Sequence, residues 1–132
     1  MPELAKTFVV LSPVLSATPV EVTPDVFQAL DRRFDGFRGH TLLASFSFAQ
    51  DWDTWERHPA GDETVVLVSG QVRMVLEEAG GERSVELEKP GDFVIVPKGI
   101  WHRAETDRPT TMIFLTPGEG TENRPRRTAP TS

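Results

Sequence analysis

Residues 91–102 read Gly-Asp-Phe-Val-Ile-Val-Pro-Lys-Gly-Ile-Trp-His, and this stretch indicates the architecture of the chain. The run at 92–96 predicts a short buried strand, and the Pro/Gly turn after it leads into a second strand that bears His102. Just upstream, Pro90-Gly91 has the composition of a type II turn, because proline sets φ at the second position and glycine accepts the positive φ of the third. We therefore expect a strand–turn–strand unit that carries an imidazole.

The same pattern extends over residues 40–116, where short runs rich in β-branched or aromatic residues alternate with turn residues. The predicted strands are His40–Phe48, Thr54–Pro59, Glu63–Ser69, Gln71–Glu78, Arg83–Lys89, Asp92–Val96, Trp101–Thr106 and Thr110–Thr116. Many short strands with no helix between them are typical of a sandwich or barrel, so we predict an all-β fold. Residues expected to include the barrel lining are Phe46, Phe48, Val65, Leu67, Met74, Met112 and Phe114.

The two ends of the chain differ from this region. Residues 1–39 predict a strand at Thr7–Leu11 and one short helix that starts after Thr23, a good N-cap, and ends near Gly36. Residues 117–132 are rich in Gly, Pro, Thr and Arg and predict a structureless tail. We interpret the chain as a single domain. Residues 1–39 pack on a barrel of residues 40–118, and residues 119–132 form a flexible tail.

The composition of the chain argues against several functional classes. A chain of 132 residues suits one domain, and the absence of cysteine excludes disulfides, thiolate metal sites and cysteine nucleophiles. The formal net charge of -6 argues against a nucleic-acid partner. Its one dense basic cluster, Arg124, Arg126 and Arg127, lies in the predicted tail. Apolar runs are too short to cross a membrane and no signal peptide is evident, so we expect a soluble cytoplasmic protein.

A metal site is the chemistry that the sequence favours. Side chains two apart on a strand share a face, so Glu56 and His58 can point the same way, and Glu63 opens the next strand after a turn. If these strands neighbour the one with His102, two imidazoles and a carboxylate converge inside the barrel. That donor set suits Fe, Mn, Ni or Zn with open positions for water or substrate. Each residue alone has an ordinary structural explanation; their joint spacing favours metal.

These spacings resemble the two motifs of the cupin superfamily. The first is matched by His58, four residues, Glu63, six residues and Gly70. The second is matched by the stretch already quoted, with its Gly, Pro-x-Gly and His at the family's spacing. The 20 residues between the motifs resemble the length found in small prokaryotic members. The resemblance implies a jelly-roll barrel, or double-stranded β-helix, to which the predicted N-terminal helix is added.

Three positions depart from the family pattern. Glu56 stands where the first histidine of a His-x-His pair is expected, Gln50 replaces a glycine, and Thr106 replaces an asparagine. The resemblance therefore implies His58, Glu63 and His102 as metal ligands. It leaves Glu56 as a fourth ligand or a proton acceptor, unless that side chain turns to solvent or pairs with a nearby arginine.

The resemblance also implies a function class. We expect one divalent transition metal per chain (Fe, Mn, Zn or Ni) and a dioxygenase-like oxidation or isomerisation of a small oxygen-bearing molecule in the barrel. A non-catalytic metal or small-molecule sensor is the alternative, and a barrel that has lost its metal is a third reading. We also expect a homodimer in which the strand at Thr7–Leu11 adds to a partner's sheet edge. The third histidine, His40, fits no motif and is expected at the surface.

Overall fold

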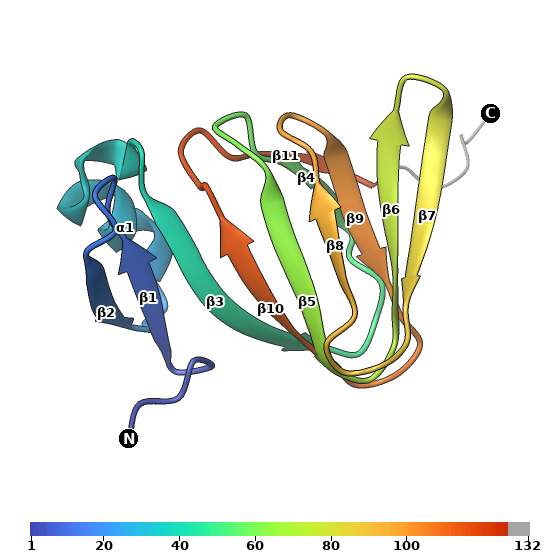
Figure 1. Cartoon of the computed structure of the whole chain (residues 1–132), viewed down its shortest axis with the longest axis horizontal. Helices are drawn as coiled ribbons and strands as arrows, with labels where there is room; N and C mark the ends of the chain where they lie inside the picture. The colour runs from blue at the N-terminus through green and yellow to red at the C-terminus, as the bar shows by residue number, and fades with distance from the viewer. Residues whose placement is uncertain (127–132) are drawn as a thin grey trace.

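Two antiparallel sheets face each other in the computed structural model, which describes residues 1–126 (Figure 1). The larger sheet has the strand order β2-β1-β3-β10-β5-β8, and the smaller has the order β11-β4-β9-β6-β7. The strand bounds are β1 Thr7–Leu11, β2 Ala17–Glu21, β3 Thr41–Phe48, β4 Thr54–Arg57, β5 Glu63–Ser69, β6 Val72–Glu78, β7 Gly81–Leu87, β8 Phe93–Val96, β9 Trp101–Glu105, β10 Thr110–Thr116 and β11 Glu122–Pro125.

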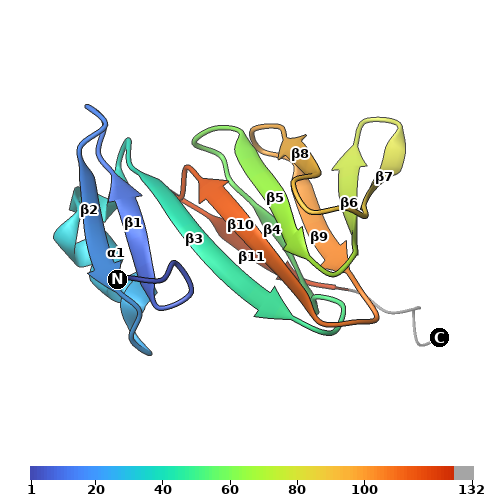
Figure 2. The same cartoon turned by 60° about the horizontal axis from the view of Figure 1, so that its bottom comes forward.

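The barrel core lies between the inner faces of the two sheets; in Figure 2, β10 and β5 of the larger sheet lie in front of β11 and β4 of the smaller. Alternation along the strands explains it, because β5 buries Glu63, Val65 and Leu67 while Val68 is exposed. The core contains Val65, Leu67, Val72, Met74, Leu76, Leu87, Val94, Val96, Ala104, Met112 and Phe114. Five of the seven predicted lining residues belong to it, whereas Phe48 packs against its margin and Phe46 is 38% exposed. The predicted all-β barrel is confirmed.

Glycines sit where the motifs require them. Gly91 has a φ of 93°, and Asp92 N–H donates to the Lys89 carbonyl at 2.9 Å, which is the predicted turn. Gly70 has a φ of 86°, and a Cβ at that position would clash with the carbonyl oxygen of Pro109. Both positions therefore exclude a side chain for backbone reasons alone.

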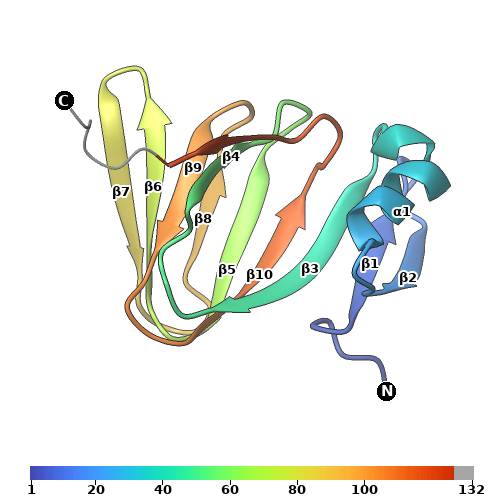
Figure 3. The same cartoon turned by 180° about the vertical axis from the view of Figure 1, so that it is seen from behind.

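The N-terminal region extends the larger sheet and carries helix α1, Val26–Arg33, on its inner face (Figure 3). The predicted helix is present but starts two residues later than expected. Thr23 Oγ1 donates to the Asp25 carboxylate instead of capping a backbone N–H. Helix and strands share a second core of Phe8, Val10, Val20, Val26, Leu30, Phe37, Leu42 and Ala44. No helix among residues 1–126 is long and apolar enough to span a bilayer.

Strands β1 and β2 correct two expectations. The sequence did not predict β2, which contains Pro19; a proline is tolerated there because β2 is the edge strand of its sheet. As a consequence β1 lies between β2 and β3, and both of its hydrogen-bonding edges are used within the chain. The expectation that Thr7–Leu11 pairs with a partner's sheet is therefore wrong.

The C-terminal segment gives a third correction. Residues 119–132 were predicted to be a flexible tail, but Glu122–Pro125 form β11, which pairs with β4. Arg124 anchors it through two aromatic rings, because its guanidinium lies 4.5 Å from the ring centroid of Trp101 and 5.1 Å from that of Trp55. Contacts with residues far away in the sequence hold this strand, so local pattern did not reveal it. Residues 127–132, including Arg127, lie outside the described part of the chain.

Candidate metal centre

Four side chains from three strands and one loop meet at one end of the barrel. Glu56 lies on β4 opposite His102 of β9, His58 directly follows β4, and Glu63 opens β5. Glu63 Oε1 is 3.0 Å from His102 Nε2, and Glu63 Oε2 is 3.3 Å from His58 Nε2. The structure thus brings together all four residues singled out by the sequence, while their role as metal ligands stays a prediction.

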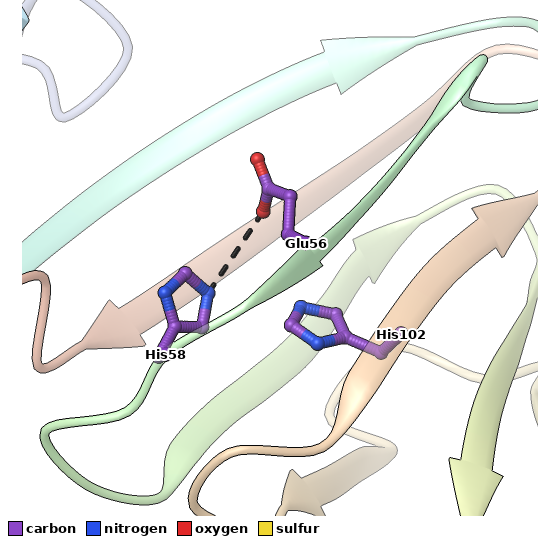
Figure 4. Close-up of side chains that lie close together, drawn as sticks. All are labelled: Glu56, His58 and His102. Atoms are coloured by element: carbon purple, nitrogen blue, oxygen red, sulfur yellow. Dashed lines mark ion pairs between the residues drawn. The ribbon is translucent and has the colours of Figure 1, made fainter. Parts of the chain in front are cut away.

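Glu56 lies beside the two histidines, as Figure 4 shows. Its Oε2 is 3.8 Å from His58 Nε2, and each of the three residues offers a ligand atom within 4.8 Å of the others. The side chain of Glu56 is 33% exposed, whereas those of His58, Glu63 and His102 are nearly inaccessible. Glu56 is therefore the member of the cluster that an incoming molecule reaches.

Hydrogen bonds behind the cluster set the tautomer of both histidines. Thr121 Oγ1 donates to the Gly118 carbonyl and accepts from Nδ1–H of His58 at 2.8 Å. His102 Nδ1–H donates to the Ile100 carbonyl, which can only accept, at 3.1 Å. With Nδ1 protonated on both rings, each Nε2 turns a lone pair toward Glu63, as in histidines that ligate metals.

The carboxylate of Glu63 is oriented in the same way. Thr116 Oγ1 donates to its Oε2 at 2.5 Å, and this pair is buried. Three buried atoms of the cluster have no hydrogen-bond partner: His58 Nε2, His102 Nε2 and Glu63 Oε1. Unpartnered buried polar atoms are costly, and lone pairs this close repel one another unless they share a cation or a proton. Two imidazole nitrogens and one or two carboxylate oxygens fit a divalent transition metal.

Without metal, a proton takes the place of the cation. Burial on its own would raise the pKa of Glu63, but the His102 and His58 rings against its carboxylate, when they carry a proton at Nε2, lower it to about 2. Burial opposes a charge on His102, yet the neighbouring Glu63 carboxylate outweighs burial and raises the pKa of His102 above its usual value. Burial, reinforced by repulsion from Glu63, raises the pKa of Glu56.

Sequence reasoning missed two residues that support the site. Thr116 is a polar residue at an inward position of β10, and the alternation along that strand could have indicated that it faces the barrel interior. Thr121 had no signal, because it lies in the segment interpreted as a tail. The arginines that might have paired with Glu56 are engaged elsewhere, Arg57 with Glu122 and Arg103 with Glu105.

The third histidine lies away from the cluster, as expected. His40 Nδ1 bonds to the Arg38 carbonyl at 2.7 Å, and its ring packs on Phe34 and Phe37 beside helix α1.

Comparison with known proteins decides the family. The model of the cupin domain matches residues 48–117, more than half of the chain. The chain belongs to the cupin family. Its match spans both motifs, from the end of β3 through β10, and includes every residue of the cluster. A search of curated proteins found no match.

Solved structures agree on the cupin fold. Oxalate decarboxylase of Bacillus subtilis, in a study of its Mn(II) centres, has 20% identity and a TM-score of 0.51 over 65% of this chain. An oxalate oxidase has 18% identity and a TM-score of 0.53 over 61% of this chain. The matches span only 23% and 44% of those two proteins, respectively. At these identities the likeness establishes the jelly-roll fold, and the activities are those of the other proteins.

Proposed function

We propose that this cupin binds one divalent transition metal per chain through Nε2 of His58, Nε2 of His102 and Oε1 of Glu63. The observation that carries the proposal is that these three buried atoms converge and have no hydrogen-bond partner. Fe, Mn, Zn and Ni all accept such donors. The Mn(II) centres of the structurally similar oxalate decarboxylase make manganese a reasonable first metal to test.

The reaction that we propose is a dioxygenase-like oxidation or an isomerisation of a small oxygen-bearing molecule. A bound metal supplies Lewis acidity there, or binds dioxygen if it is iron. Glu56 is the exposed member of the cluster, and its raised pKa suits a carboxyl group that holds or accepts a substrate proton at Oε2. Its other role is that of a fourth ligand. Thr121 and Thr116 keep His58 and Glu63 oriented toward the site.

Metal content after incubation and dialysis tests the first part. The unmodified protein should retain about one equivalent of metal, and His102→Ala and Glu63→Gln should retain far less while their circular dichroism spectra show a folded barrel. His40→Ala is the matched control, because it removes a histidine outside the cluster. Unchanged retention in both cluster variants would refute the proposed site. Oxygen uptake with small phenols, diketones and thiols tests the second part.

A non-catalytic sensor is the alternative function. Glu56 is the only substantially exposed member of the cluster in the described chain, so the cluster offers a substrate one accessible acid–base group and no second. A sensor would bind metal and raise its melting temperature with a small ligand, yet turn over none of the panel. Metal-dependent turnover would rule this alternative out.

A homodimer is part of the proposal, now through the outer face of the larger sheet. Exposed apolar side chains gather there on β8, β5 and β10: Phe93, Ile95, Val68 and Leu115. The outward positions of β8, β5, β10 and β3 carry no charged side chain, so two copies of this face meet without like charges opposed. Light scattering should give twice the chain mass, and Ile95→Glu should give the monomer. Phe27→Glu, at an exposed phenylalanine of helix α1, is the control.

A cytoplasmic location is also retained as a proposal. The cysteine-free composition, which suits a reducing compartment, is its support.

A further inference from the structure

A cleft of about 530 Å³ lies next to the metal cluster, lined by residues 48–54 and by Glu56. Residues 49–53 form the loop that connects β3 of the larger sheet to β4 of the smaller, so the cleft lies where this loop joins the two sheets. Glu56 belongs both to the cleft lining and to the cluster with His58 and His102. A molecule in this cleft therefore has a direct approach to the proposed ion.

Aromatic rings line one route from the surface to the cluster. The ring centroid of Trp52 is 6.3 Å from that of His102 and 6.0 Å from that of Phe114, and Phe48 also packs on Trp52, at 5.8 Å. Phe46 continues the series at 5.5 Å from Phe114. We call Phe46, Phe48, Trp52 and Phe114 the aromatic wall. The ring centroid of Phe27 on helix α1 lies 6.4 Å from that of Phe46, and the Phe27 side chain is 54% exposed.

The charged side chains that line the cleft are all acidic: Asp51, Asp53 and Glu56, with no Lys, Arg or His in the described lining. Arg126 pairs with Asp51 from outside the lining at 3.1 Å, which leaves Asp53 and Glu56 as the unneutralised acidic side chains of the cleft. The carboxylate of Glu63, and that of Glu56 when it is ionised, offset the charge of a divalent ion. A small dianion would therefore meet little uncompensated positive charge, and it would approach past the acidic side chains of Asp53 and Glu56.

We propose that the cleft selects neutral or singly charged oxygen-bearing molecules with an aromatic ring, and disfavours small dicarboxylates such as oxalate. Trp52 is the specificity-determining residue, because its ring lies between His102 and the rest of the aromatic wall. Aromatic pairs at such centroid distances are favourable beyond simple burial. The inference rests on the proposed metal site and separates this chain by substrate class from the oxalate-processing cupins that share its fold.

Two hydroxamic acids with one metal-binding group but different bodies test the role of the wall. Binding of benzohydroxamic acid, acetohydroxamic acid and oxalate to the Zn(II)-loaded protein is measured by calorimetry, with zinc content checked before and after each titration. We expect benzohydroxamic acid to bind about tenfold or more tightly than acetohydroxamic acid, and oxalate to bind more weakly than benzohydroxamic acid. Trp52→Phe keeps the ring and should preserve the preference. Trp52→Leu keeps an apolar side chain without the ring and should reduce the preference below threefold.

Two further variants complete the design. Phe93→Leu, on the outer face of the larger sheet, should leave the preference for the aromatic ligand unchanged. Asp53→Lys should tighten oxalate binding at least fivefold, because it places a cation at an exposed position of the cleft. Equal affinity for the two hydroxamic acids, or oxalate binding as tight as that of benzohydroxamic acid, overturns the inference while the metal site stands. Failure to retain zinc overturns the proposed function and this inference with it.

Discussion

Thr121 and His58 are joined by a hydrogen bond of 2.8 Å, although 63 residues separate them in the chain. The threonine lies just before β11, and its own hydroxyl proton is used on the Gly118 carbonyl. The oxygen therefore remains free to accept from Nδ1–H of His58 and leaves Nε2 for the metal. The C-terminal segment is in this way part of the proposed metal centre.

Thr121→Val should weaken metal binding about 10- to 100-fold, because the valine keeps the shape but leaves the His58 tautomer unassigned. A competition titration with a chromophoric chelator measures the affinity. Thr121→Ser restores the hydroxyl and should recover most of the loss. Thr111→Val, which removes a hydroxyl bonded to Ser47 on the exposed side of β10, is the control. An affinity of Thr121→Val equal to that of the unmodified protein would show that the bond does not orient the ligand.

Arg124→Met should destabilise the barrel by about 1 kcal/mol, since it removes a guanidinium that contacts the faces of Trp55 and Trp101 and an ion pair with Glu77. Urea denaturation measures the change. Arg83→Met is the matched control, because Arg83 forms an ion pair with Glu78 at similar exposure but does not stack on a tryptophan in the described chain. Equal effects of the two substitutions would mean that the tryptophan contacts add nothing to the ion pair.

Metal affinity should fall as the pH is lowered. A metal needs the Nε2 lone pair of His102, but the metal-free protein holds a proton there because Glu63 raises the pKa of His102 above 6.5. Below that raised pKa the affinity should drop by up to about tenfold per pH unit for one displaced proton. Glu63 stays ionised in this range because its pKa is about 2. Zinc titrations between pH 6 and pH 9 measure the slope, and a flat profile would contradict proton competition.

The folding stability of the metal-free protein should depend on pH in the opposite direction and fall as the pH rises above neutrality. His102 has a raised pKa in the fold, so its contribution is complete below its unfolded value of 6.5 and is lost as the pH rises through the raised pKa. Glu63 has a lowered pKa, so its contribution is present above 4.5 and is lost as the pH falls toward about 2. These two groups together favour stability between pH 4.5 and 6.5. Chemical denaturation across pH checks this, and Glu63→Gln should flatten the profile.

Much of the barrel could be predicted from the sequence, because patterns of neighbouring residues specify its strands and turns. Alternating apolar residues with Gly and Pro at the turns specify short antiparallel strands, and each predicted strand of residues 40–116 has its counterpart between β3 and β10. The spacing of His58, Glu63 and His102 was sufficient to nominate the site, since strand alternation and turn length restrict where those side chains point. The proposed function class rests on residue chemistry joined to a family resemblance.

The remaining features depend on contacts between distant segments. Pro19 is compatible with a strand only because β2 lies at the edge of the sheet, and the sequence around it gives no such information. Strand β11 has no apolar alternation, and the guanidinium of Arg124 holds it against two tryptophans from other strands. Thr121 became part of the site through that docking. Local pattern specifies strands and turns, whereas the partners of a polar side chain are specified only when the packed sheets bring them within hydrogen-bonding reach.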